Sequence, residues 1–353
     1  AMAARRPFGV TQEELHLLEQ QQTEANIAVL PFRAAAPGVT TPEDFAASLA
    51  SKRFAKPEEL LAYFVEEHRP HIEVEGSVFR LQREDETDNL SPEEIEQAAQ
   101  ERLLWDEQNL RPQCLSTPTV VDHRPDQTGI RNQEDRGTCV CFASLACLEA
   151  IFQRQGTILD LSEQYANWLF MHFEGRDQCD DGMKTTDAAS YLSRKGVCEE
   201  ALYPYEDDAN VNQHCSAQPP APVQQQARYG VGRYVIIDRP GLNGPSIANT
   251  TYLECLLSAG YDIVFGTHVA WGHPDAAGVF DLIRDPYGNP LRSRGGHAML
   301  LVGYVRSAPL PYFIFKNSWG STGVSGYYYL SYDYVRYYSK YGYVVLAVRS
   351  EMA

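Results

Sequence analysis

The pattern of apolar and polar residues divides the chain into a helical part and a strand-rich part. Residues 138–155 are apolar on almost every side in their first half, which predicts a buried helix ending before Gly156. Helical patterns follow over 161–172, behind the start signal LSEQ, and over 186–195. After residue 226 the apolar stretches are typical of strands: RYVIID, YDIVFGTHV, AMLLVGYV, YFIFKNSW, GYYYLSY and YGYVVLAV. Helices followed by strands predict an α+β fold with segregated layers.

The first third of the chain has a different pattern of residues, with several helix start signals. Helix start signals stand at Thr11, Thr41, Pro57 and Ser91. Before the last of them, HIEVEGSVFRLQ alternates in the manner of a strand or hairpin. The stretch RPQCLSTPTVVDHRP then has the composition of an extended linker. We therefore expect a helical N-terminal segment at 1–113 and a second domain at 114–350, mainly helical over 114–226 and mainly β over 227–350.

Charge and composition narrow the classes of function. The chain of 353 residues has a formal net charge of -17, and residues 1–113 hold 22 acidic and 11 basic side chains. Such a balance repels phosphates, so we expect no nucleic-acid partner. No apolar run approaches the roughly 18 to 20 residues that span a bilayer, so we expect no membrane span. The start AMAARRPFGV lacks the apolar core of an intact secretory signal. The compartment stays open, with an extracytoplasmic one favoured.

The eight cysteines form neither a dense disulfide scaffold nor the paired CxxC motifs of a zinc module. Three of them, Cys139, Cys141 and Cys147, share the predicted buried helix, and the others are scattered. Cys179 and Cys215 flank loops in a cysteine-poor region, so we take them as the candidate disulfide pair.

Cys139 differs from its two neighbours because it stands at the start of the helix. Unpaired amide N–H groups and the helix dipole stabilise a thiolate there and lower the pKa of the thiol. Cys141 and Cys147 lack this position and are expected to pack as small apolar side chains. Judged by its position alone, Cys139 could also be a buried structural cysteine of the core.

A thiolate nucleophile needs a base, and the base needs a partner that fixes its tautomer. His297 begins an apolar strand after Gly295 and Gly296, whose small size leaves room for a substrate backbone. Asn317 ends the next predicted strand, 20 residues later, where a hairpin could return it to His297. The pattern predicts a Cys139, His297 and Asn317 site, although a histidine at a strand start is also a common structural residue.

Three segments resemble those that carry the active site of papain-like cysteine peptidases: IRNQEDRGTCVCFAS, GGHAMLLVGY and FKNSWGSTGVSGYYYL. Shorter pieces fit the same family in order, namely PTVVDHR, LSEQY, CDDGM and ALYPYE. The resemblance covers about residues 116 to 350. It implies a two-lobed catalytic domain, with a helical lobe and an antiparallel, barrel-like β lobe.

The resemblance also implies roles for single residues. Gln133, which would otherwise be taken as an exposed polar residue, would form the oxyanion hole with the backbone N–H of Cys139. Trp319 would shield the hydrogen bond between His297 and Asn317 from water. Gly182 would lie along the substrate cleft, where a missing side chain lets a peptide backbone approach.

The sequence departs from the family pattern in two ways. The usual run C-G-[SA]-C-[WY] is replaced by Arg136-Gly-Thr-Cys139-Val140, so Arg136 stands for a cysteine and Val140 for an aromatic residue. Cys179 thereby loses the partner that the resemblance implies, and Val140 puts the shape of the substrate pocket in doubt. His297 and Asn317 follow Cys139 by 158 and 178 residues, against about 130 to 150 in the family. Extra loops are expected in SAQPPAPVQQQ and in residues 270–293, which could overhang the cleft.

The implied reaction is acyl transfer on peptide or protein substrates, with a thiolate–imidazolium pair in the resting enzyme and no cofactor. Residues 1–113 would act as a propeptide and intramolecular inhibitor, released at about residues 112 to 118; the alternative is a permanent regulatory domain. A catalytically inactive binding protein or a transpeptidase using the same site stays open. A zinc site at His268 and His273 is disfavoured because no third ligand stands at a helpful spacing.

Overall fold

The computed structural model describes residues 71–82, 100–111, 114–175, 182–206, 217–239 and 245–351. All of these residues belong to one compact unit, Pro70–Ala353. The helices expected to start near Thr11, Thr41, Pro57 and Ser91 begin outside the described residues, as do both members of the candidate pair, Cys179 and Cys215. Those predictions are therefore untested.

The helical lobe contains the three helices that the sequence predicts, each within two residues of the expected bounds. Helix α5 is buried on nearly all sides, and α6 begins at the capping Ser162, whose side chain accepts from the Tyr165 N–H, and ends at the left-handed Gly175. The stretch SAQPPAPVQQQ, expected as a loop, contains the single helical turn α8. The bounds are α5 Cys139–Arg154, α6 Glu163–Glu174, α7 Thr185–Arg194 and α8 Ala221–Gln224, with 3-10 turns η3 Arg124–Asp126 and η4 Glu200–Leu202.

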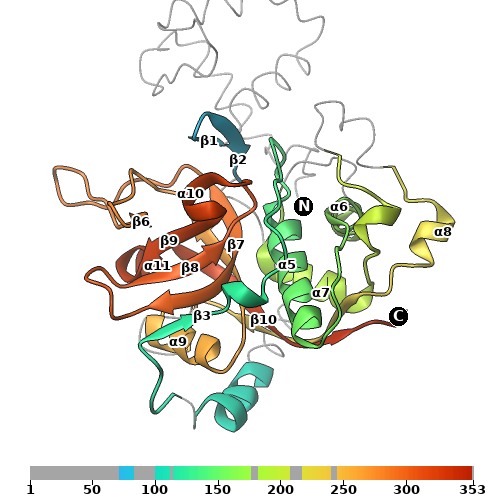
Figure 1. Cartoon of the computed structure of the whole chain (residues 1–353), viewed down its shortest axis with the longest axis horizontal. Helices are drawn as coiled ribbons and strands as arrows, with labels where there is room; N and C mark the ends of the chain where they lie inside the picture. The colour runs from blue at the N-terminus through green and yellow to red at the C-terminus, as the bar shows by residue number, and fades with distance from the viewer. Residues whose placement is uncertain are drawn as a thin grey trace, which may run out of the picture. The chain divides into compact units, whose positions relative to one another are not determined.

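The β lobe is built on one sheet with the strand order β4-β10-β5-β7-β8-β9-β6, and β3 pairs with β7 beside this path. All neighbours are antiparallel except β6 and β9. The predicted α+β fold is confirmed (Figure 1). The strands are β3 Val120–Asp122, β4 Gly230–Ile237, β5 Ile263–His268, β6 Val279–Phe280, β7 Gly296–Val305, β8 Tyr312–Lys316, β9 Tyr327–Ser331 and β10 Ser339–Arg349.

Two helices of the β lobe were not predicted. Helix α9, Thr250–Ser258, starts at Asn249, whose side chain accepts from the Tyr252 N–H. Helix α11, Tyr332–Tyr338, is rich in tyrosine and has the composition of a strand, but Ser331 caps it by accepting from the Tyr334 N–H. In α11 the cap and tertiary packing outweigh the strand-like composition, whereas the three leucines and the glutamate of α9 favour a helix. A short turn, α10 Thr322–Ser325, precedes β9.

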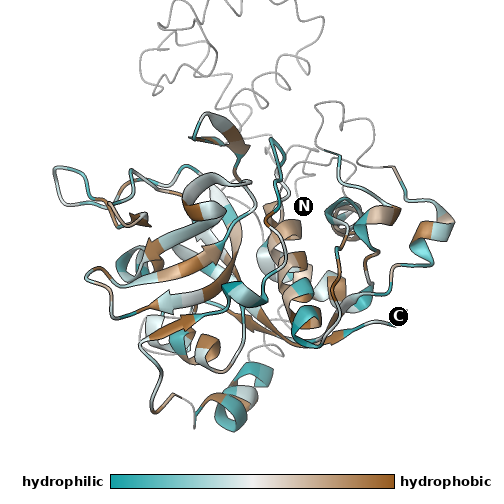
Figure 2. Cartoon of the chain, viewed as in Figure 1, coloured by the Kyte–Doolittle hydropathy of each residue, from teal (hydrophilic) through white to brown (hydrophobic). Residues whose placement is uncertain are grey.

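The core lies on both faces of β7. Ala298, Leu300 and Val302 belong to the apolar cluster shared with α5, whereas Met299 and Leu301 belong to the cluster on the opposite face. This alternation follows from the two-residue period of a strand. Figure 2 shows the hydrophobic residues concentrated in α5 and the central strands. Because α5 packs on β7, the first residue of that helix and the first residues of that strand belong to the same interface.

The expected hairpin is present as β1 His71–Val74 and β2 Ser77–Arg80. Its turn residues Glu75 and Gly76 both have positive φ, 51° and 82°, as a tight two-residue turn requires. The hairpin belongs to the same compact unit as the rest of the described chain.

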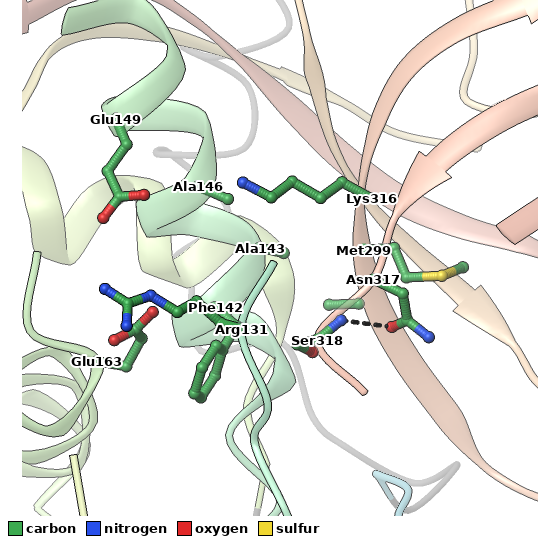
Figure 3. A pocket seen from close by; sticks show the side chains of 11 residues that line it. Arg131, Phe142, Ala143, Ala146, Glu149, Glu163, Met299, Lys316, Asn317 and Ser318 are labelled. Atoms are coloured by element: carbon green, nitrogen blue, oxygen red, sulfur yellow. Dashed lines mark hydrogen bonds between the residues drawn. The ribbon is translucent and has the colours of Figure 1, made fainter. Parts of the chain in front are cut away.

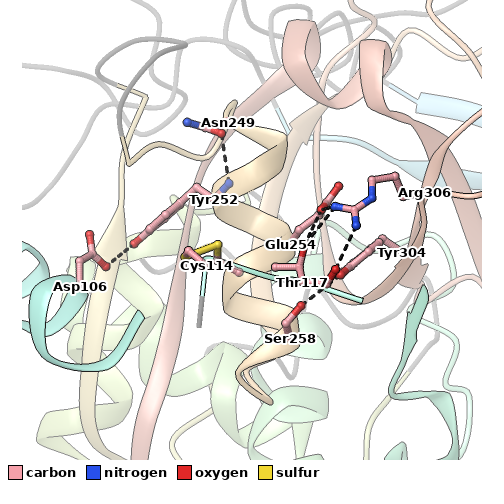
Figure 4. Close-up of a disulfide and its surroundings, with 10 residues drawn as sticks. Asp106, Cys114, Thr117, Asn249, Tyr252, Glu254, Ser258, Tyr304 and Arg306 are labelled. Atoms are coloured by element: carbon pink, nitrogen blue, oxygen red, sulfur yellow. Dashed lines mark hydrogen bonds and ion pairs between the residues drawn. A yellow bond between two sulfur atoms is a disulfide. The ribbon is translucent and has the colours of Figure 1, made fainter. Parts of the chain in front are cut away.

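The segment before β3 is fastened to α9 (Figure 4). A disulfide joins Cys114 to Cys255, the Tyr252 hydroxyl donates to the Asp106 carboxylate of the π-turn η2 Asp106–Leu110, and the Thr117 hydroxyl donates to Glu254. This disulfide was not predicted, because its members are 141 residues apart and nothing local marks them as partners. The division at residue 113 falls inside the compact unit and stays a prediction about processing.

Candidate active site

Cys139 is the first residue of α5 and is fully buried. Residue Thr138 precedes it as the N-cap, and the Thr138 carbonyl accepts from the Cys141 N–H. The start of a helix favours an anionic sulfur, as the sequence predicts. Cys141 and Cys147 lie deeper in the same helix, where burial raises the pKa of each thiol and keeps it protonated.

The antiparallel pairing of β7 and β8 brings His297 and Asn317 together. The His297 Nε2 atom lies 2.7 Å from Asn317 Oδ1. Because an amide oxygen can only accept, Nε2 carries the proton and the lone pair of a neutral ring lies on Nδ1. No hydrogen bond reaches Nδ1 from any described residue. The ring is therefore held as a base with its free nitrogen available.

Two tryptophans enclose the imidazole. Trp319 stacks on His297 with ring centroids 4.4 Å apart, and Trp271 approaches the same ring edge-on at 6.4 Å. Burial lowers the pKa of His297 to about 4, although the Asn317 hydrogen bond partly opposes the shift. The imidazole is thus neutral at pH 7 in this state. The thiolate–imidazolium pair stays a prediction for a site open to water.

Gln133 is fully buried, so the expectation of an exposed side chain, drawn without the resemblance, is wrong. Its Oε1 atom accepts from the Ser318 hydroxyl at 2.6 Å, and its Nε2 atom donates to the Arg136 carbonyl at 2.6 Å. An amide nitrogen carries two protons, so one N–H remains for a substrate oxygen. Ser318, which the sequence analysis did not single out, fixes the orientation of this amide.

Arg136 is buried where the family has a cysteine. Its Nη1 atom donates to Gln164 Oε1 at 2.7 Å and to the Glu206 carbonyl, and its guanidinium lies 4.6 Å from the centroid of the Tyr205 ring. These contacts tie the Cys139 loop to α6 and to the turn ALYPYE without a disulfide at this position. Val140 is buried in the core, and its effect on a substrate pocket stays untested.

Tyr205 braces both ends of the loop that precedes α5. Its hydroxyl lies 2.9 Å from the Gln133 carbonyl, to which it donates, and 2.8 Å from the Thr138 hydroxyl. Phe142 packs edge-on against the same ring. The sequence analysis used ALYPYE only as a segment that fits the family and missed this role, for which the tyrosine itself was the available signal.

Gln82 makes hydrogen bonds to Met183, the residue after Gly182, and to Gly296. The backbone N–H and carbonyl of Gln82 pair with the carbonyl and N–H of Gly296, each at 2.7 Å, and the Gln82 Nε2 atom donates to the Met183 carbonyl at 2.8 Å. Gly182 has a φ of 45°, which only glycine adopts at little cost. The N-terminal segment therefore bridges the helical lobe and the residue before His297.

This set of residues can be compared with known proteins. The model of the papain family cysteine proteases matches residues 117–238 and 277–343, more than half of the chain. The chain belongs to the papain family. Cys114 and Cys255, which form the disulfide, both lie outside the matched residues.

The chain spans about half the length of the curated papain-family relatives that it matches. A viral cathepsin of Lymantria dispar multicapsid nuclear polyhedrosis virus is 30% identical over 204 residues, which cover 57% of this chain and 50% of the relative. Chymopapain of Carica papaya is 29% identical over 217 residues, covering 60% and 54%. The structure is similar to xylellain, a cysteine protease from Xylella fastidiosa, with a TM-score of 0.55, 24% identity and coverage of 67% of this chain and 88% of that one. The predicted papain-like fold is confirmed.

A cavity lined partly by ionisable side chains lies beside Asn317 in this papain-family member (Figure 3). It is lined by Glu149, Glu163 and Lys316, among others. Lys316 Nζ donates to the Thr128 carbonyl at 2.9 Å, and the Thr128 hydroxyl donates to Glu149 at 2.6 Å. Burial raises the pKa of Glu163 to about 8 and lowers the pKa of Lys316 to about 8. At neutral pH the carboxyl is therefore mostly protonated, which limits the charge enclosed there.

Two further expectations concern metals and membranes. Among the described residues, including His268 and His273, no group of three or more His, Cys, Asp or Glu side chains could hold a metal ion. Within the same part of the chain, no helix has the length and apolar character needed to cross a bilayer.

Proposed function

We propose that this chain is a thiol-dependent peptidase that uses Cys139 as nucleophile, His297 as base and Asn317 as the group that orients the base. The hydrogen bond of 2.7 Å between His297 Nε2 and Asn317 Oδ1 carries this proposal, because it leaves Nδ1 basic. Cys139 and His297 stand at the ends of α5 and β7, two elements packed on each other.

The reaction proceeds in two acyl transfers. Nδ1 of His297 takes the thiol proton, and the Cys139 sulfur attacks the peptide carbonyl carbon to form a C–S bond. The carbonyl electrons move to oxygen, and their return expels the amine, which takes the proton from Nδ1. Water then gives a proton to Nδ1 and attacks the acyl carbon, and the C–S bond breaks to restore the thiolate.

The negative charge on the carbonyl oxygen is stabilised by two donors, the second N–H of Gln133 Nε2 and the backbone N–H of Cys139. The Gln133 amide is held in advance by Ser318 and by the Arg136 carbonyl, so its orientation needs no rearrangement during the reaction. Loss of one such donor costs about 10²- to 10³-fold in kcat.

We further propose that the N-terminal segment holds the peptidase inactive. Gln82 pairs with Gly296, next to His297, and Phe79 stacks on Trp319 with ring centroids 4.8 Å apart. Glu75 accepts from the Gly323 N–H at 3.0 Å, which fastens the hairpin at its turn. A substrate peptide and this segment would compete for the same backbone groups of Gly296.

The test uses the full chain and an epoxide peptide that alkylates thiolates, with mass spectrometry of the labelled site and a peptide cleavage assay. The Cys139→Ala variant is expected to lose both labelling and cleavage. The matched control is Cys141→Ala, on the same helix, which is expected to keep both. Cleavage that persists in Cys139→Ala contradicts the proposal, and labelling of Cys139 without any cleavage favours an inactive binding protein.

A further inference from the structure

The ammonium groups of two lysines lie close to one tyrosine ring, near the start of the strand that holds His297. Lys184 Nζ lies 4.9 Å and Lys340 Nζ 5.4 Å from the centroid of the Tyr341 ring. The chain has only six lysines and a net charge of -17, so two lysines at one ring are an unusual local excess of positive charge. Both lysines are partly buried.

The Gln82 side chain lies at this positive region. A Cβ atom placed on Gly296 would stand 3.2 Å from Lys340 Nζ, 3.4 Å from Gln82 Cβ and 3.6 Å from Gln82 Oε1. The amide oxygen of Gln82 and the ammonium of Lys340 therefore share the same side of Gly296. Only 4% of the Gln82 surface is exposed. We call this location, between Gly296, Met183 and Lys340, the Gln82 position.

The Gln82 position is where a substrate side chain would lie once the segment is displaced. Its walls offer one acceptor, the Met183 carbonyl, and one cation, Lys340. Among the described residues, no carboxylate forms an ion pair with Lys340, and an apolar side chain would cover its ammonium without pairing it.

Two interactions compete over which polar side chain fits best. Glutamine donates a neutral hydrogen bond to the Met183 carbonyl, whereas a carboxylate would accept a charge-assisted hydrogen bond from Lys340. The second is the stronger of the two. We propose that the enzyme prefers substrates with an acidic side chain, glutamate foremost, at the Gln82 position. This inference rests on the proposed peptidase function.

The experiment uses the full chain, before and after any self-processing, with matched internally quenched peptides. Each position on both sides of the cleaved bond is varied in turn among Glu, Gln, Leu and Lys. At one position we expect kcat/KM to be about tenfold higher for Glu than for Gln. Lys340→Gln is expected to bring this ratio within twofold of one, and Lys340→Glu to reverse the preference toward Lys. Lys195→Glu makes the same charge change at an exposed site and should leave the ratio as in the parent.

The outcomes separate this inference from the function on which it rests. Cleavage that depends on Cys139 but shows no preference for Glu at any position overturns the acidic preference alone. A preference for Glu that survives in Lys340→Glu also overturns it. Equal cleavage of the Leu peptide by parent and variants serves as the control for folding. If no peptide is cleaved in a Cys139-dependent way, the peptidase function itself is wrong.

Discussion

Phe79 stacks on Trp319, and Trp319 stacks on His297, so three rings from distant parts of the chain form one column. The two centroid distances are 4.8 and 4.4 Å. Trp319 covers the His297 ring and also contacts Phe79 of the N-terminal hairpin. The same residue thus serves the proposed chemistry and its proposed inhibition.

Phe79→Ala is expected to open the site in the unprocessed chain. Burial of a phenylalanine side chain and its stacking contribute about 2 to 4 kcal/mol together, so the rate of Cys139 alkylation should rise roughly 30- to 700-fold. Val78→Ala, at a neighbouring exposed position, is the control and should have no effect. Equal alkylation rates in Phe79→Ala and the parent would refute inhibition by this contact.

Acid should weaken the inhibited state. The pKa of His297 is lowered to about 4 by burial, against about 6.5 in an open site, so the covered state binds fewer protons. The covered state keeps its full stability above pH 6.5. As the pH falls from 6.5 toward 4, the equilibrium constant that favours the covered over the open state declines by up to tenfold per pH unit. Hydrogen exchange of the Gln82 amide, corrected for its intrinsic pH dependence, should accelerate over this range. Protection that stays constant from pH 6.5 to 4 would contradict the prediction.

The Cys114–Cys255 disulfide should retain the N-terminal fragment after processing. Leu115 is 86% exposed, so the backbone next to it is accessible to cleavage, and a cut there lies after Cys114. We expect the fragment to stay attached on a gel without reductant and to separate when reductant is added. In Cys114→Ser it should separate under both conditions. A fragment that is free without reductant in the parent would place the cut before Cys114.

Tyr205→Phe should slow catalysis without weakening substrate binding. The lost hydroxyl holds the Gln133 carbonyl and contacts Thr138, so the oxyanion donor would lose part of its support. We expect kcat to fall about tenfold and KM to stay within twofold, with a loss of about 1 kcal/mol in unfolding free energy. Tyr203→Phe is the matched control, since its hydroxyl donates only to the Ala217 carbonyl. Equal kcat losses in both variants would show a general effect on stability instead.

Local patterns in the sequence determined much of the fold. The apolar stretch at 138–155, the capping Ser162 and the Glu75–Gly76 turn each encode an element within a few residues, because periodicity, caps and turns act over such distances. The positions of Cys139, His297 and Asn317 could likewise be predicted from the sequence, because each stands at the end of a helix or strand with a clear pattern. Helix α11 was missed because its tyrosine-rich composition favours strands, whereas α9 was missed although its leucines and glutamate favour a helix.

Only the tertiary structure decided which distant residues meet. Gln82 reaches Gly296, Arg136 reaches Gln164, and Cys114 reaches Cys255 through closure of long loops that no local pattern records. Each of these contacts depends on the packing of both lobes, where buried polar groups must find partners because water is excluded. The sequence by itself determined the secondary-structure elements and the order of the reactive residues. The packing of the two lobes decided which residues cover the site, which ones support its side chains and which charges lie beside it.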